Sequence, residues 1–243
     1  MQMRVITFAL VFLATPSCGT KNLGDCPATS PLVKCTALTT DEKIRRALND
    51  EDLDTARTLL EDAIAAEPDN YGRYPLLSAV YAGLAGFKLL AILQQANSSG
   101  SSSITDAMDA FLPTPQGMSR EEYDARIALL GDAIATINAL PAEFLATAST
   151  DKYAASASQQ LGIYQAAQAS MYMKLFTYDF TTGSADPAQI SQLTDQDAAR
   201  IMSLLSAAAT GGGPMAGIAA STLAAINAGG GTDRDNLANF LGS

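Results

Sequence analysis

The chain has 243 residues, with 25 acidic and 15 basic side chains, a net charge of -10, no histidine and no tryptophan. The absence of histidine removes the usual general base, histidine-dependent nucleophile triads and nearly all zinc and di-iron sites of helical proteins, so we expect no catalytic, metal or cofactor site. The negative charge argues against nucleic acid as a partner, because that affinity depends on Lys and Arg side chains that neutralise phosphates.

The first 17 residues have the three-part layout of a secretory signal peptide, with Arg4, an apolar run over 5–14 and small residues before Cys18. The run is too short for a membrane-spanning helix, which needs roughly 20 residues. The sequence TPSCG around Cys18 resembles the box that precedes the lipidated cysteine of bacterial lipoproteins, although the usual leucine is a threonine here. We therefore expect cleavage before Cys18 and an acyl anchor on its side chain; the alternative is ordinary cleavage after Gly19.

Residues 18–38 are expected to form a lipidated tether that carries the folded part of the chain at a membrane surface. Cys26 and Cys35 are the remaining cysteines, and an oxidising compartment favours a disulfide that closes a small loop; two buried free thiols are the alternative. Without the signal peptide, 14 basic and 25 acidic residues remain and the net charge is -11, so anionic lipids would repel the protein and attachment depends on the acyl chains. Gly19 after the lipidated cysteine favours the outer membrane, facing the periplasm.

Residues 39–243 are predicted to form a single all-α domain, an antiparallel array of helical hairpins closed by further helices, because the segment is rich in Ala, Leu, Gln and Met. A hydroxyl residue followed three positions later by an acid is typical of a helix start, and it occurs at Thr39, Ser119, Thr194 and Thr232. No strand is predicted. The predicted helices cover 40–48, 51–66, 74–96, 104–111, 120–139, 142–148, 151–179, 187–192, 195–209, 215–227 and 233–241.

Three Gly- or Ser-rich stretches interrupt this pattern. The Ser-rich segment 97–103 is interpreted as a solvated loop within one domain, and a linker between two domains is the alternative. The glycine triplets at 211–213 and 229–231 are interpreted as helix ends with close packing, and a hinge for a moving C-terminal segment is the alternative.

Residues 50–87 carry the most specific pattern of the chain. Small residues and a proline at the spacing of a tetratricopeptide second helix are followed by first-helix residues of a next repeat; the eight positions are Ala56, Leu60, Ala63, Pro68, Tyr74, Leu77, Ser78 and Tyr81. With the signal and the acidic helical body, the segment resembles bacterial tetratricopeptide-type lipoproteins, in particular the T component associated with tripartite ATP-independent periplasmic transporters. The resemblance implies a helical periplasmic scaffold with a groove or pore that contacts a partner protein or a small apolar ligand.

Four aromatic residues of this segment are candidates for lining such a groove: Tyr71, Tyr74, Tyr81 and Phe87. The alternative is that they are ordinary core residues. The apolar helix predicted over 74–96 is interpreted as a buried helix and not as a membrane span, because Lys88 lies in its middle. A second aromatic cluster along 151–179 and its end could form a contact surface or one buried stripe; its members are Tyr164, Tyr172, Met173, Phe176, Tyr178 and Phe180.

These observations favour a non-catalytic scaffold, or an assembly or transport accessory factor, that binds an envelope protein. The alternative is a carrier that holds an apolar small molecule between helices. A carrier needs an enclosed apolar cavity, whereas a scaffold needs an exposed apolar groove or patch. An enzyme could work only through carboxylates or through Ser and Lys, and its site would show convergent polar groups in a cleft.

Overall fold

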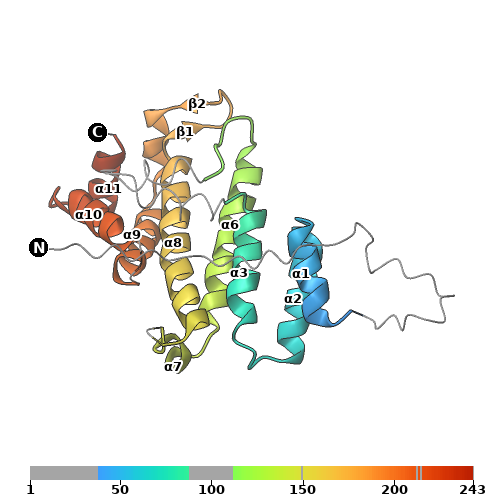
Figure 1. Cartoon of the computed structure of the whole chain (residues 1–243). Coiled ribbons are helices and arrows are strands. Elements are labelled where there is room, and N and C mark those ends of the chain that lie inside the picture. Colours follow the sequence, from blue (N-terminus) through green and yellow to red (C-terminus); the bar gives the residue numbers. More distant parts are fainter. Residues whose placement is uncertain (1–37, 88–111, 149, 212, 214, 243) are drawn as a thin grey trace, which may run out of the picture. The chain divides into compact units, whose positions relative to one another are not determined.

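A computed structural model describes residues 38–87, 112–148, 150–211, 213 and 215–242 (Figure 1). The expected signal peptide, Cys18, Cys26 and Cys35 lie outside the described residues, as do the loop 97–103 and the helix predicted over 104–111. Residues 40–243 group into one unit, separate from residues 1–39. Apart from residues 38 and 39, the described residues all belong to the second unit.

The second unit confirms the predicted all-α class, since its described residues fold almost entirely into helices that pack on one another. The α-helices are α1 Thr40–Asn49, α2 Leu53–Ala66, α3 Arg73–Leu84, α6 Arg120–Asn138, α7 Ala142–Leu145, α8 Lys152–Leu175, α9 Asp195–Thr210, α10 Ala216–Asn227 and α11 Asp233–Leu241, and a 3-10 helix η1 spans Pro187–Gln192.

Helix starts agree with the sequence pattern where side chains can satisfy free backbone amides. Ser119 and Glu122 form a full capping box at the start of α6, and Thr194 with Asp197 does the same at α9. Thr232 accepts a hydrogen bond from the amide of Asp235 at the start of α11. The spacing of three positions from hydroxyl to acid is thus a reliable local signal for where these helices begin.

The predicted helix over 151–179 ends earlier, at Leu175, and is followed by a short hairpin that the sequence analysis did not predict. Strand β1 Tyr178–Asp179 pairs antiparallel with β2 Ser184–Ala185. The turn between the strands is stabilised by the carboxylate of Asp179, which accepts hydrogen bonds from the amide of Thr181 at 2.8 Å and the hydroxyl of Thr182 at 2.9 Å. Gly183, with φ +72, supplies the left-handed residue that closes the turn.

The helix predicted over 74–96 also needs correction, because α3 ends at Leu84. Gly86 has φ +83, its amide donates to the carbonyl of Gly83, and the amide of Phe87 donates to the carbonyl of Ala82. These two bonds around a left-handed glycine are those of a Schellman motif, which satisfies the last carbonyls of a helix. The remainder of the predicted helix, from residue 88 onward, lies outside the described residues.

The helices pack as an ordered array in which α1 contacts α2, α2 contacts α3, α3 contacts α6, α6 contacts α8 and α8 contacts α9. Figure 1 shows these helices side by side, with α10 and α11 next to α9. Short turns join α1 to α2 and α2 to α3, so the first three helices run back and forth as hairpins. They enclose a small core of their own, while α3 also closes the larger core around α6, α8 and α9.

Two buried side chains fix α6 between its neighbours. The hydroxyl of Ser78 on α3 donates to the carbonyl of Ala133 at 2.7 Å, and the amide of Gln168 on α8 donates to the carbonyl of Ile127 at 3.0 Å. Both bonds satisfy polar groups that would be costly to bury alone. Ser78 therefore lies at a close approach of two helices, as a small residue at that position suggests.

Helix α8 is buried around most of its circumference, from Gly162 to Met171 without a break. Tyr164 and Met173 are fully buried and Phe176 nearly so, whereas Tyr172, Tyr178 and Phe180 are partly buried. The second aromatic cluster is thus largely part of the core. None of the described helices is both long and apolar enough to cross a membrane.

Candidate functional site

The four aromatic residues proposed to line a groove lie at three separate places. Phe87 is buried and contacts the ring of Tyr164, with 5.7 Å between ring centroids. Tyr71 contacts Phe144 of α7, with 4.8 Å between ring centroids and the rings tilted by 46°. Tyr74 lies beside Tyr71 at 6.4 Å between ring centroids.

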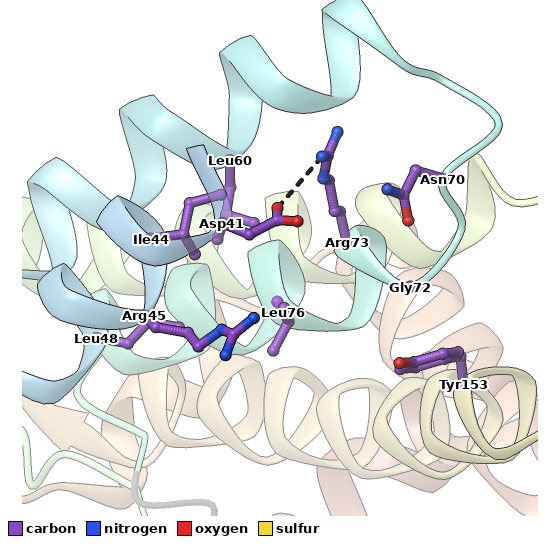
Figure 2. A pocket seen from close by; sticks show the side chains of 10 residues that line it. All are labelled: Asp41, Ile44, Arg45, Leu48, Leu60, Asn70, Gly72, Arg73, Leu76 and Tyr153. Carbon is purple, nitrogen blue, oxygen red and sulfur yellow. Dashed lines mark hydrogen bonds and ion pairs between the residues drawn. The ribbon is translucent and has the colours of Figure 1, made fainter. Parts of the chain in front are cut away.

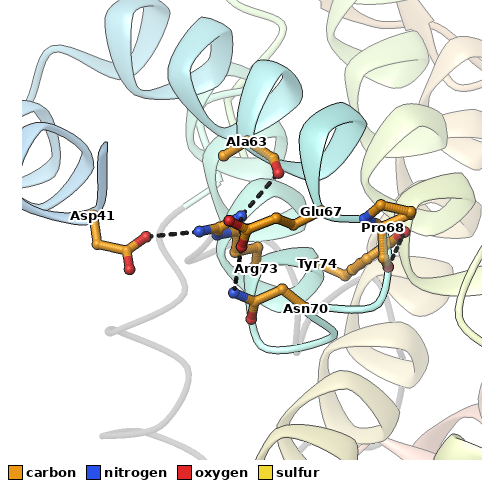
Figure 3. Close-up of polar contacts among 7 residues, drawn as sticks. All are labelled: Asp41, Ala63, Glu67, Pro68, Asn70, Arg73 and Tyr74. Atoms are coloured by element: carbon orange, nitrogen blue, oxygen red, sulfur yellow. Dashed lines mark hydrogen bonds and ion pairs between the residues drawn. The ribbon is translucent and has the colours of Figure 1, made fainter. Parts of the chain in front are cut away.

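Hydrogen bonds hold two of these tyrosines against the hairpin of α2 and α3. The hydroxyl of Tyr74 donates to the carbonyl of Pro68 at 3.0 Å (Figure 3). The hydroxyl of Tyr81 donates to the carboxylate of Glu61 at 2.6 Å. Partial burial, together with that carboxylate, raises the pKa of Tyr81 to about 12. None of the four aromatic residues lines either of two open pockets that lie across α1, α3 and α8. A role of these aromatic residues in binding stays a prediction.

An exposed apolar groove lies elsewhere, across α1, α3 and the start of α8. It consists of two adjacent open pockets of about 380 Å³ and 340 Å³, which share Gly72, Leu76 and Tyr153 in their walls. Leu76 is 44% exposed and Tyr153 is 45% exposed. Among the described residues, the only other exposed large hydrophobic side chain is Leu38, which is 37% exposed. We call this surface the Leu76–Tyr153 groove.

The larger pocket, which we call the α1 pocket, lies between α1 and α3 (Figure 2). Helix α1 contributes Ile44 and Leu48, and Leu60 of α2 is buried beneath them. The spacing of the four α1 residues in the wall places them on one face of the helix; these are Asp41, Ile44, Arg45 and Leu48. The pocket thus combines an apolar floor with charged groups at its rim.

The smaller pocket, which we call the α8 pocket, lies between α3 and α8. Its apolar wall is formed by Pro75 and Ala79 of α3, and its polar wall by Ser156 and Gln160 of α8. Lys152, the first residue of α8, also lines it and lies over the ring of Tyr153, with 4.8 Å from Nζ to the ring centroid. A lysine at this distance from an aromatic face is attracted by the ring.

Arg73 positions the walls of the α1 pocket. Its guanidinium donates to the carbonyl of Ala63 at 2.8 Å and lies 3.0 Å from the carboxylate of Glu67 and 3.2 Å from that of Asp41 (Figure 3). The side chain is only 10% exposed. One arginine therefore joins the start of α1, the end of α2 and the start of α3.

Two cations of the groove, Arg45 and Lys152, have no ion pair among the described residues. Arg45 forms no ion pair or hydrogen bond with any residue that the structure describes, and Lys152 has only its contact with Tyr153. The one carboxylate in the walls of the two pockets, that of Asp41, is bound to Arg73. The groove is therefore locally basic on a strongly acidic chain.

The groove offers apolar contact surface and two positive charges. Within the described part of the chain, no three acidic or cysteine side chains gather closely enough to hold a metal ion. No protein-family model, no curated protein and no solved structure matches the chain.

The sequence analysis did not single out Leu76, Tyr153, Arg45 or Lys152. Their positions on α1, α3 and α8 are far apart in the chain, and no local motif links them. One signal was available: Leu76 is an apolar residue outside the eight-position repeat pattern, so nothing in that pattern assigns it to a helix contact.

Proposed function

We propose that the protein is a lipid-anchored envelope protein whose helical body is a non-catalytic scaffold or an assembly or transport accessory factor. It binds a partner protein through the Leu76–Tyr153 groove. The observation that carries this proposal is the pairing of two exposed hydrophobic side chains, Leu76 and Tyr153, between two open pockets. Exposed apolar groups gathered at one place and rimmed by polar residues are typical of protein-binding sites.

The position of the groove supports the resemblance to tetratricopeptide-type lipoproteins. Ala56, Leu60 and Ala63 of α2 are buried, as the small and apolar positions of a second helix should be. Helices α1 and α3, which take the first-helix positions, supply most of the groove wall. A transporter component as partner is part of this proposal, and it follows from the resemblance alone.

The alternative function, a carrier for an apolar small molecule, has one observation in its favour. Pockets of about 380 Å³ and 340 Å³ are in the size range of small-molecule sites. Both pockets open to solvent, however, and charged residues line each of them. An enclosed apolar cavity, which a carrier needs to keep its ligand from water, is not among the two pockets described, and we favour the scaffold.

Affinity capture from detergent-solubilised envelopes tests the proposal. The wild type is compared with Leu76→Asp, which places a charge in the groove, and with Leu38→Asp, a matched change at an exposed leucine outside the walls of both pockets. We expect one stoichiometric protein to be recovered with the wild type and Leu38→Asp and lost with Leu76→Asp. Equal recovery with all three proteins would refute the groove, and recovery of lipid alone would favour the carrier.

The anchor is tested separately. A clickable fatty acid is supplied to cells that produce the wild type or Cys18→Ser. We expect labelling of the wild type only, in the outer-membrane fraction. Equal labelling of the two proteins would end the lipoprotein part of the proposal and leave the groove untouched.

A further inference from the structure

We infer that the segment bound in the Leu76–Tyr153 groove is acidic: its apolar side chains cover Leu76 and Tyr153, and its carboxylates pair with Arg45 and Lys152. This inference rests on the proposed function and names the chemistry of the partner. It follows from three features of the groove and one of the whole chain. The groove has an apolar ridge shared by both pockets, two cations without an ion pair among the described residues, and nearby carboxylates, Asp41 and Asp151, that bind other groups. The chain as a whole is negatively charged.

The apolar ridge is formed by Leu76 and Tyr153 and separates the two pockets. A Cβ atom at Gly72 would lie 3.4 Å from the ring of Tyr153, so the ring faces the start of α3 at Gly72. Leu76 lines both pockets as well. A bound chain that crosses the ridge can therefore place one apolar side chain in each pocket, against Leu48 in the first and Ala79 in the second.

Arg45 forms no ion pair with any residue in the part of the chain that the structure describes. Asp41 precedes Arg45 by four residues, the spacing at which an acid and a base pair on a helix surface. The Oδ1 atom of Asp41 instead lies 3.2 Å from Nη2 of Arg73. Arg45 is an exposed residue and lines the α1 pocket. Its charge is thus available to a ligand at the rim.

Lys152 likewise forms no ion pair with a carboxylate among the described residues. The adjacent carboxylate of Asp151 caps α8 by accepting hydrogen bonds from the amides of Tyr153 at 2.7 Å and Ala154 at 3.0 Å. The ammonium lies over the ring of Tyr153, at the rim of the α8 pocket. Each pocket thus has one cation that no carboxylate of the described residues neutralises.

The rest of the chain determines which anion fits. Its net charge of -10 repels nucleic acid and anionic membrane surfaces at long range. A short acidic segment with interspersed apolar residues meets less of this repulsion, because it brings few charges and places them beside the two cations. The ridge supplies apolar contact for its other side chains, which a free phosphate or a sugar would leave unused.

Fluorescence anisotropy with three synthetic peptides tests the inference on the full-length protein in detergent. The peptides share one pattern of Leu and Phe and differ only in carrying Glu, Gln or Lys at the polar positions. We expect the Glu peptide to bind most tightly, on the order of tenfold more tightly than the Gln peptide, and its affinity to fall as salt is added.

Charge reversal assigns the binding to the groove. Arg45→Glu and Lys152→Glu are each expected to weaken the Glu peptide on the order of tenfold and to strengthen the Lys peptide. Lys43→Glu is the matched control, because Lys43 is an exposed residue of α1 outside the walls of both pockets. Leu76→Asp is expected to abolish binding of the Glu peptide, and circular dichroism verifies that each variant is folded.

The inference is overturned if the Gln or Lys peptide binds as well as the Glu peptide, if no peptide binds, or if Lys43→Glu acts like the groove variants. Binding of dodecanoate alone, without the Glu peptide, would likewise overturn it and would favour the carrier. Affinity capture distinguishes the scaffold function from the acidic character of the bound segment. If the captured partner is lost with Leu76→Asp but the peptides show no charge preference, the scaffold function stands and the acidic segment is refuted.

Discussion

Arg73 and Asp41 form an ion pair, 3.2 Å between Nη2 and Oδ1, that joins the start of α1 to the start of α3. The same arginine donates to the buried carbonyl of Ala63 at the end of α2. Arg73 therefore has two roles: it joins the first three helices, and it neutralises the one carboxylate in the walls of the two pockets. Stability and the charge of the groove both depend on this side chain.

Replacing Arg73 by Met should lower the free energy of unfolding by about 1–3 kcal/mol, because the carbonyl of Ala63 loses its buried hydrogen-bond partner at 2.8 Å. Urea denaturation followed by circular dichroism measures the change. Arg46→Met is the control: Arg46 is exposed and its ion pair with Asp50 is 3.8 Å long, so we expect a change within about 0.5 kcal/mol. Equal effects of the two variants would show that Arg73 does not connect the helices.

Gly86→Ala should destabilise the end of α3. Alanine at φ +83 costs about 1–2 kcal/mol, and its Cβ atom would also collide with the guanidinium of Arg126. Gly117→Ala isolates the first cost, because Gly117 has φ +80 with open space around it. Gly72→Ala should be neutral or slightly stabilising, because Gly72 has a helical φ of -65. The urea midpoint should be lowest for Gly86→Ala, higher for Gly117→Ala and highest for Gly72→Ala. A Gly86→Ala protein as stable as the Gly117→Ala protein would contradict the packing of Arg126.

Ser119→Ala should remove the capping box of α6 and cost about 0.5–2 kcal/mol. Ser203→Ala serves as the control, because Ser203 is an exposed residue inside α9, where alanine favours the helix. Thermal unfolding of the two variants measures the difference. A loss for Ser203→Ala as large as that for Ser119→Ala would mean that the cap does not hold the start of α6.

Features such as helix starts, which depend on residues close in the chain, could be predicted from the sequence, whereas features that depend on tertiary contacts could not. A cap joins residues three positions apart, so Ser119 and Thr194 marked helix starts correctly. The end of α3 was missed although Gly86 is a typical helix terminator, because the apolar pattern continues past it. The hairpin at Tyr178 was missed because two-residue strands leave almost no periodicity to detect.

The groove could not be predicted for a different reason. Tyr153 and Leu76 line the same pockets only because α3 and α8 pack together, and nothing in either segment encodes that packing. Phe87 shows the converse: an aromatic residue in a repeat-like segment was a reasonable candidate for a binding surface, yet the fold buries it against Tyr164. Composition predicts which side chains are apolar, whereas tertiary packing decides which of them remain exposed.

The raised pKa of Tyr81 should make the free energy of unfolding depend on pH in the alkaline range. Its pKa is raised to about 12, so the folded state holds the proton more tightly than the unfolded chain, whose tyrosines ionise near pH 10. The stabilisation is complete below about pH 10 and is lost as the pH rises toward about 12. Urea denaturation should therefore show an advantage of the wild type over Tyr81→Phe that shrinks across this interval.

Glu61→Gln provides the control for that titration, because it removes the carboxylate that Tyr81 contacts at 2.6 Å. Ultraviolet absorbance should show Tyr81 ionising at lower pH in this variant than in the wild type. A constant difference between wild type and Tyr81→Phe at all pH values would contradict the raised pKa.

Photo-crosslinking from position 76 in cells that make the protein natively is the most direct test of the central claim, that the Leu76–Tyr153 groove binds an acidic partner segment. The crosslinking residue replaces Leu76 in one protein and the exposed Leu38 in another. We expect one discrete protein adduct from position 76, absent from position 38, joined within an acidic segment by mass spectrometry and reduced by Lys152→Glu. The absence of an adduct at position 76, or the same adducts from both positions, would contradict the claim.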